Sequence, residues 1–503
     1  MYVYKYKSLP FLFSFFLFCL ISSSVSSQYT IDYNQSVRNI YKNIIDLKLS
    51  QVPNEINELR IKQPYNLAVL HLENYHDFFN LFINEDEKAF KRLVKNKNKR
   101  LKLIDKHLLD NNPFKRFLKA EINLQWALAR SKFGQLFRAS GEIYTAYNLL
   151  EENQNLFPDF IYNKKSLSIL HSLVETITLP GIMKRLFGLS GSISLAKEEI
   201  NEVIEFSKRE PFIFKEEADA IKIFVLFYQA NEKAEAWAYA QNCSLNADES
   251  LLAVFLISKI AQRIGENDVA IKMLENRPRG NEYSSFHYLE YQLGLSKLRK
   301  LDPRAVDHID FYLKNFNGRH FIKEAYQKMA WSKLIFEDSP ELYQKFISKV
   351  ESFGDNLVDD DKQAMAESKR GQAPDRDLLS VRLLFDGGYY EQALELAEKI
   401  KGNYGEEHAF HLEYKYRVGR ILQQLGKSEE AINAFKYVLA KGGNDDAYFA
   451  CAASLQIGLI YEGIGGYKNA ELYFQKCLDL TPTDYKRSLH QKAKSGMKRI
   501  ELN

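Results

Sequence analysis

The sequence repeats itself near its C-terminal end, and this repetition constrains the fold more than any other feature. One glycine recurs in steps of 38 and 39 residues, at Gly388, Gly426 and Gly465. An alanine five residues further on keeps the same steps, at Ala393, Ala431 and Ala470. Apolar residues around these positions recur at helical spacing, whereas the alternation typical of strands is missing. A helical period of this length predicts an all-α solenoid in which helical hairpins stack on one another.

The other residue types that recur at fixed offsets also fit a helical hairpin. A small residue seven positions before the turn, Gly419 or Gly458, lets the two helices approach closely, and the following glycine serves the turn. The alanine belongs where the helices are nearest, and Phe435 or Phe474 fills the space between them. Pro482 then ends the second helix of the last copy.

This set of positions resembles the tetratricopeptide repeat, whose unit has 34 residues. The longer step here implies loops that are about four or five residues longer between units. Two further copies lie upstream. In one, Gly134, Gly141 and Ala146 match the offsets of Gly458, Gly465 and Ala470, and in the other, Gly265 and Ala270 match more loosely. The first of these predicts a hairpin at about residues 127–160.

We therefore expect four parts in the chain. Residues 1–27 are expected to be a signal peptide, and residues 28–200 an irregular helical region that contains the 127–160 unit. Degenerate helical repeats are expected at 201–350, and a C-terminal array with a capping helix at 374–503. The polar, acidic stretch at 352–377 marks the seam before that array.

One apolar segment interrupts the pattern at residues 179–192. Its Leu179, Pro180, Leu186, Leu189 and Gly191 resemble an arrangement in the tetratricopeptide repeat 39 family, in which a first repeat is followed by a Pro, a short Leu-rich helix and a Gly-containing turn. The segment is expected either to pack as a helix inside the superhelix or to contact lipid or a partner as a peripheral element.

The N-terminus has the pattern of a secretory signal. Lys5 and Lys7 precede an apolar core of about 13 residues, which is too short to cross a membrane. Val25 and Ser27 favour cleavage before Gln28, whereas Phe18 is too bulky to precede a lipidated Cys19. We expect export to a periplasm or cell envelope, with an uncleaved or lipid anchor and a cytosolic protein as alternatives. After cleavage, no integral membrane span is expected.

Charge and motifs give little support to catalysis or to nucleic-acid binding. The net charge is +4 over 503 residues, which is too small for a nucleic-acid footprint. Ser194 and Lys197 match the S-x-x-K spacing of penicillin-binding enzymes without its companion motifs. His408 and His411 share a helix face, but zinc would need further ligands. We expect no catalytic residue, no cofactor and no metal site.

The first helices of the repeats are the expected binding surface, because they line the concave face of a solenoid. In the C-terminal repeats the outward positions include Tyr416, Arg420, Leu455 and Leu459, which predict a mixed aromatic and aliphatic groove for a protein or peptide partner. The alternative is that they pack against a capping helix at residues 485–502. The expected function is a non-enzymatic scaffold or adaptor in a bacterial envelope. The competing hypothesis is a carrier whose N-terminal helices enclose a hydrophobic ligand or lipid.

Overall fold

A computed structural model describes residues 29–176, 189–442 and 448–501. These residues form helices joined by short turns, and their only β-type pairing is an isolated bridge between Thr30 and Asn66. The all-α class expected from the helical periodicity is confirmed. The predicted signal peptide at 1–27 and most of the apolar segment at 179–192 lie outside the described residues.

The helices fall into three groups along the chain. The N-terminal group is α2 (Gln35–Ile45), α3 (Val52–Lys62), α4 (Ala68–Asn84), α5 (Glu87–His107), α6 (Pro113–Lys132), α7 (Leu136–Leu156), α8 (Tyr162–Thr176), α10 (Ile193–Arg209), α11 (Lys215–Phe224) with the π-helical turn η1 (Val225–Gln229), and α12 (Lys233–Ala240). The middle group is α13 (Leu251–Ile264), α14 (Asn267–Glu275), α15 (Tyr288–Arg299), α16 (Ala305–Asn315), α17 (Ile322–Glu337), α18 (Pro340–Ile347), α19 (Lys349–Ser352) and α20 (Asp359–Arg370). The C-terminal group is α21 (Arg376–Asp386), α22 (Tyr390–Ile400) with the 3₁₀ turn η2 (Lys401–Asn403), α23 (His411–Gln424), α24 (Ser428–Gly442), α25 (Phe449–Gly463), α26 (Tyr467–Asp479) and α27 (Lys486–Ile500).

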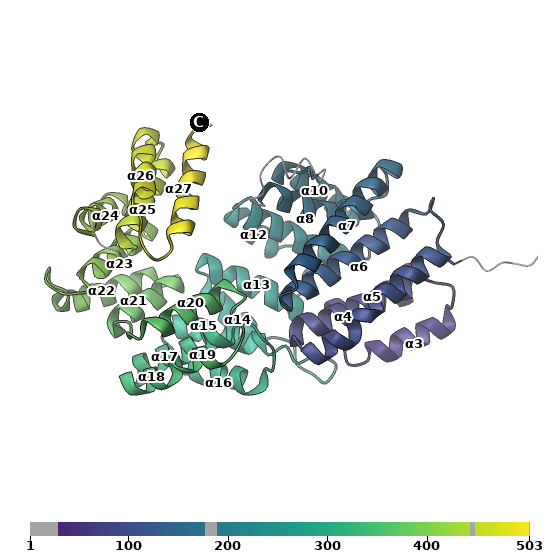
Figure 1. Ribbon diagram of the computed structural model, residues 1–503, viewed down its shortest axis with the longest axis horizontal. Coiled ribbons are helices and arrows are strands. Elements are labelled where there is room, and N and C mark those ends of the chain that lie inside the picture. The colour runs from purple at the N-terminus through teal and green to yellow at the C-terminus, as the bar shows by residue number, and fades with distance from the viewer. Residues whose placement is uncertain (1–28, 177–188, 443–447, 502–503) are drawn as a thin grey trace, which may run out of the picture.

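Neighbouring helices pair as antiparallel hairpins, and the hairpins stack into a curved array. The pairs α6–α7, α25–α26, α8–α10 and α23–α24 pack most extensively. Figure 1 shows the array running from the purple helices on the right, through the green helices, to the yellow helices at the left. This is the helical-hairpin solenoid that the repeats predicted.

The turn glycines adopt the left-handed conformation that favours glycine. Gly265, Gly388, Gly426 and Gly465 have φ values between 75° and 88°, and each stands at the turn of a hairpin. The alanines that follow them, Ala270, Ala393, Ala431 and Ala470, are fully buried on the second helices. The repeat register predicted for these four hairpins is confirmed.

For the copy at 127–160, the sequence predicts the turn at Gly141, and this prediction is wrong. The chain turns at Gly134, where φ is 72°, whereas Gly141 lies exposed within α7. Phe137, which that prediction aligns with Tyr461, is 93% exposed, whereas Leu150, aligned with Phe474, is fully buried. Ala139, five residues after the true turn, is buried, as is Ala146 two turns later. The hairpin therefore begins at Pro113, and the error arose because either glycine could be aligned with the turn.

The apolar core runs through the whole array in overlapping clusters. One cluster extends from Tyr33 to Leu383 and so passes through the division expected at residues 200 and 201. Two further clusters hold the C-terminal hairpins together, and one of them contains the fully buried Phe435 and Phe474. The four-part division of the chain stays a prediction, and the packing within the first cluster is continuous.

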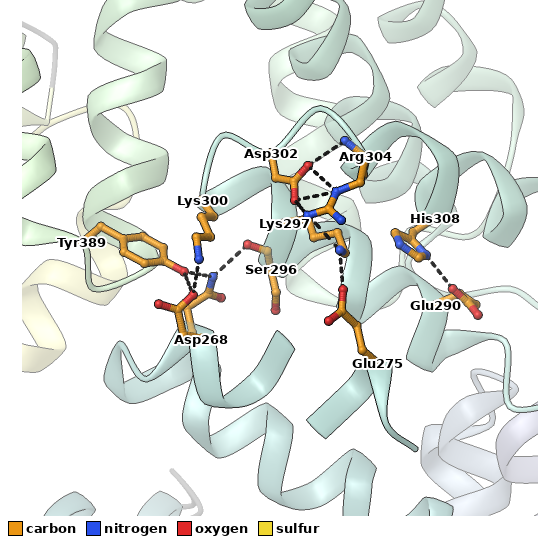
Figure 2. A network of polar contacts seen from close by, with 11 residues as sticks. Asp268, Glu275, Glu290, Ser296, Lys297, Lys300, Asp302, Arg304, His308 and Tyr389 are labelled. Carbon is orange, nitrogen blue, oxygen red and sulfur yellow. Dashed lines mark hydrogen bonds and ion pairs between the residues drawn. The ribbon is translucent and has the colours of Figure 1, made fainter. Parts of the chain in front are cut away.

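The middle and C-terminal groups meet where two hairpin turns touch. A Cβ atom at Gly388, before α22, would overlap the carbonyl group of Gly265, after α13. The phenol oxygen of Tyr389 donates a hydrogen bond to Asp268 at 2.8 Å, and Asp268 also pairs with Lys300 at 2.8 Å (Figure 2). Two turns more than 120 residues apart are thus fixed against each other by backbone contact and by polar bonds.

Candidate partner-binding site

The C-terminal group encloses a cavity of about 280 Å³ between its first helices and α27. Helices α21, α23 and α25 supply one side of it, and the last helix supplies the other. Its walls combine aromatic rings with cations. The rings are Phe385, Tyr416, Tyr448 and Tyr485, and the cations are Arg382, Arg417, Arg420 and Lys492. We call this space the C-terminal pocket.

Arg420 is held in the C-terminal pocket without a charged partner. It lies one helical turn after Tyr416 on α23, and its Nη1 donates to the Tyr416 hydroxyl at 3.3 Å. Its guanidinium lies 4.8 Å from the ring centre of Phe385, a cation–π contact. Its buried Nε has no hydrogen-bond partner among the described residues. This donor group is therefore positioned by aromatic contacts and remains available for an acceptor.

The C-terminal pocket carries more positive than negative charge. Arg417 pairs with Glu413, and Arg382 lies 3.5 Å from Asp386. Within the described residues, neither Arg420 nor Lys492 has a carboxylate at salt-bridge distance. Burial and the nearby charge of Arg420 both lower the pKa of Lys492. An anionic group entering the pocket would relieve this repulsion between Arg420 and Lys492.

The structure brings together three of the four predicted groove residues. Tyr416, Arg420 and Leu455 line the C-terminal pocket, whereas Leu459 lies outside it, half-buried against the C-terminal core. Tyr416 and Leu455 are also buried, with 6% and 1% of their surfaces exposed, whereas residues that line an open groove face solvent. Tyr416 was predicted at an outward position, yet the centre of its ring lies 5.9 Å from that of Phe435 on the paired helix α24.

Groove and capping helix turn out to be parts of one arrangement. The last helix, α27, covers the C-terminal hairpins through Leu489 and Ala493, and the same helix supplies Tyr485 and Lys492 to the pocket. Sequence reasoning missed Arg382, although the 38-residue step carries Arg420 back onto it. It also missed Lys492, because α27 has no repeat landmarks.

The N-terminal group encloses a second, mainly apolar cavity of about 250 Å³. Side chains of α4, α6, α8 and α11 line it, among them Phe78, Leu128 and Leu173, and α13 of the middle group completes the lining. At its wall, Lys165 pairs with Glu121 at 2.8 Å and with Glu217 at 2.6 Å. This cavity is where the described residues could enclose a hydrophobic ligand.

Comparison with known proteins identifies the repeats. The tetratricopeptide repeat family model matches residues 412–439 and 452–484, which are α23–α24 and α25–α26 with the turn that follows. These two segments of the chain are tetratricopeptide repeats. Such repeats typically form non-enzymatic scaffolds that bind other proteins. No curated protein matches the sequence significantly.

Two solved structures are similar over most of their length. One is the tetratricopeptide repeat domain of P58(IPK), at 15% identity over 83% of this chain and 98% of that one, with a TM-score of 0.23. The other is a monomeric mutant of IFIT1 with m7Gppp-AAAA, at 14% identity over 87% and 99%, with a TM-score of 0.30. TM-scores of 0.23 and 0.30 are too low to indicate a shared overall shape or a shared ligand.

No helix in the described ranges is both long and apolar enough to cross a membrane. Among the same residues, no three His, Cys, Asp or Glu side chains gather where they could hold a metal ion.

Proposed function

We propose that this chain is an exported scaffold in a bacterial envelope, and that its C-terminal pocket binds an acidic segment of a partner protein. One observation carries the choice of an acidic partner. Arg420 and Lys492 lie in an aromatic-walled pocket with no carboxylate at salt-bridge distance among the described residues. Aromatic and Arg anchors are the residues at which interface energy concentrates. The predicted mixed aromatic and aliphatic groove thereby becomes a cationic and aromatic one.

Binding of a labelled peptide tests this proposal. A fluorescent peptide of alternating Glu and Leu is titrated with the protein beside a matched peptide of Gln and Leu. The Glu peptide should bind more tightly, and raised salt should weaken it. Arg420→Gln and Lys492→Gln should each weaken binding by about 1–2 kcal/mol, roughly 5- to 30-fold.

Lys494→Gln is the matched control, because Lys494 lies on the same helix as Lys492 but does not line the C-terminal pocket. It should leave affinity unchanged, and circular dichroism should show all three variants folded. Equal binding of the two peptides, or equal effects of the Lys492 and Lys494 variants, would refute an acidic partner.

Export rests on the N-terminal sequence alone, with Lys5 and Lys7 before a short apolar core and Val25 and Ser27 before Gln28. N-terminal sequencing of the protein recovered from its host should begin at or near Gln28. A chain that retains Met1, or one lipidated at Cys19, would contradict this part of the proposal.

The apolar cavity of the N-terminal group favours one second candidate, a carrier of a hydrophobic ligand. Organic extraction of the purified protein, followed by mass spectrometry, separates the candidates. A stoichiometric lipid that is lost in Leu128→Trp, which would fill the cavity, favours the carrier. Extracts without lipid favour the scaffold alone.

A further inference from the structure

A third cavity, of about 220 Å³, lies between the N-terminal and middle groups, apart from both sites above. Side chains of α4, α6, α13, α15 and α16 line it, together with Phe321 just before α17. Aromatic rings make up most of the wall, including Phe82, Phe255, Tyr288 and Phe316. The ring centres of Tyr288 and Phe321 are 4.7 Å apart, and those of Phe255 and Tyr288 are 6.0 Å apart. We call this space the aromatic cavity.

One of its two lysines is already neutralised. Lys132 pairs with Glu85 at 2.6 Å, and the same carboxylate accepts hydrogen bonds from the backbone N–H groups of Arg319 and His320 at 2.8 and 2.9 Å. Burial alone would raise the pKa of Glu85, but hydrogen bonds from the His320 ring and Lys132 lower it to about 2. The charges of Lys132 and Glu85 therefore cancel, and this pair presents no net charge to a ligand.

The other lysine, Lys259, has no such partner. Its Nζ donates to the Tyr288 hydroxyl at 3.1 Å and lies 5.6 and 5.8 Å from the ring centres of Tyr288 and Phe321. Within the described residues it has no carboxylate at salt-bridge distance. The acidic groups whose charge reaches it are Glu324 and Asp360, which are opposed by Arg263 and Arg299. Burial lowers the pKa of Lys259 to about 8, so the amine is mostly protonated at neutral pH.

The aromatic cavity thus presents aromatic rings, of which Tyr288 lies tilted to Phe321 and edge-on to Phe255, and one unpaired cation with N–H groups to spare. A ligand amine would meet repulsion from Lys259, and a neutral head group would leave that charge uncompensated. A carboxylate would form a charge-assisted hydrogen bond with Nζ, while an aromatic body packs against the rings. We propose that the aromatic cavity binds a small aromatic carboxylic acid, with its carboxylate on Lys259.

Three probes that share one body test this proposal on the full chain: 3-phenylpropanoate, 3-phenylpropan-1-ol and 3-phenylpropylamine. In calorimetric titration the acid should bind about tenfold or more tightly than the alcohol, and the amine should bind least. Lys259→Gln should lower the affinity for the acid to the affinity for the alcohol. Lys272→Gln, an exposed lysine on the next helix, α14, should change nothing.

A photoreactive diazirine derivative of 3-phenylpropanoate locates the site on the unaltered protein, whether or not Lys259→Gln folds. Cross-links should map to the lining helices α4, α6, α13, α15 and α16 or to the residues just before α17, and unlabelled acid should suppress them. Equal affinity for acid and alcohol, no binding at millimolar acid, or cross-links elsewhere would each overturn the inference. Binding of the Glu–Leu peptide should be unaffected by Lys259→Gln, so this test fails or succeeds separately from the proposed function.

Discussion

Single residues set the closest packing in the C-terminal repeats. Gly419 of α23 faces Phe435 of α24, and Gly458 of α25 faces Phe474 of α26. A Cβ atom would lie 2.7 Å from the Phe435 ring at the first position and 2.5 Å from the Phe474 ring at the second. Ordinary van der Waals contact between carbons needs about 3.5 Å or more. In each of these two repeats, the glycine of the first helix and the phenylalanine of the second therefore form the two sides of one interhelical contact.

Gly458→Ala should destabilise the protein by about 1–3 kcal/mol, because the Phe474 ring must move in a filled core. Gly463→Ala is the matched control on the same helix, since a Cβ atom there meets nothing within 4 Å. Alanine favours a helix over glycine, so the control should be neutral or slightly stabilising. Thermal melts of both variants give the comparison, and equal melting temperatures would mean that the repeat contact is misassigned.

His171 makes stability depend on pH. It is buried between Glu199 at 2.8 Å and Glu151 at 3.2 Å. Burial alone would lower its pKa, but hydrogen bonds and charges of the two carboxylates raise it to about 9. A histidine with a raised folded pKa stabilises the fold fully below its unfolded pKa of about 6.5, and this contribution is lost as pH rises through 9. Burial also raises the pKa of the Glu199 carboxyl.

The free energy of unfolding should therefore fall between pH 6.5 and 9, by at most about 3 kcal/mol from this residue. The melting temperature should fall with it. His171→Gln should be less stable at pH 6 and should lose that part of the slope. His408→Gln, at an exposed histidine, should keep the wild-type slope. If the melting temperature changed with pH by the same slope in the wild type and in His171→Gln, His171 would not be the source of the pH dependence.

Which residues face inward was only partly readable from sequence. The basic run at residues 88–106 has the pattern of a solvated helix face, yet Lys97 and Arg100 of α5 are buried, where they pair with Glu142 and Asp77 at 2.6 and 2.7 Å. Composition cannot show this, because the carboxylates come from other helices. Arg420 was predicted as an outward position of its repeat, whereas its place in a pocket lined also by α27 could not be read from the repeat.

Among the elements, α27 has the largest effect on the candidate site. It takes the place of a next repeat: Leu489 and Ala493 pack into the C-terminal core, and Gly496 lies against Phe474. A capping helix was predicted because solenoids need polar ends. Its second role, as a wall of the C-terminal pocket, could not be predicted, since that follows from the angle at which it folds back. The misplaced turn at Gly141 has a similar origin, because spacing alone fits two registers.

Leu489→Ala should loosen α27 and lower stability by about 2 kcal/mol, near the low end for a buried leucine, because the helix ends the array. It should also weaken binding of the Glu–Leu peptide, since Lys492 lies on the same helix. Arg487→Ala, at an exposed residue of the same helix, should affect neither quantity. Thermal melts and peptide titrations measure both. A less stable variant with unchanged affinity would show that the pocket does not need α27.

At the scale of the whole molecule, the array is continuous because hairpins from different groups are joined directly. In a simple solenoid each repeat contacts only its neighbours, and stability is close to a sum of local terms. Here the turn at Gly388 rests on the turn at Gly265, and Tyr389 bonds to Asn267 at 3.0 Å and to Asp268 at 2.8 Å. The C-terminal tetratricopeptide repeats are thus coupled to the middle group, and the step of 38 and 39 residues gave no sign of this contact.

Gly388→Ala should uncouple the two groups. Both Gly388 and Gly426 have positive φ, 82° and 75°, so alanine at either costs about 1–2 kcal/mol in backbone strain. Only at Gly388 does the new methyl group also collide with another turn, because a Cβ atom at Gly426 meets nothing within 4 Å. Gly388→Ala should therefore cost at least about 1–3 kcal/mol more than Gly426→Ala. In calorimetry the C-terminal group of Gly388→Ala should melt separately, ahead of the rest, whereas Gly426→Ala should keep the wild-type number of transitions. If the two variants melt alike, the contact between the turns contributes nothing to the coupling, and each group is held by its own core.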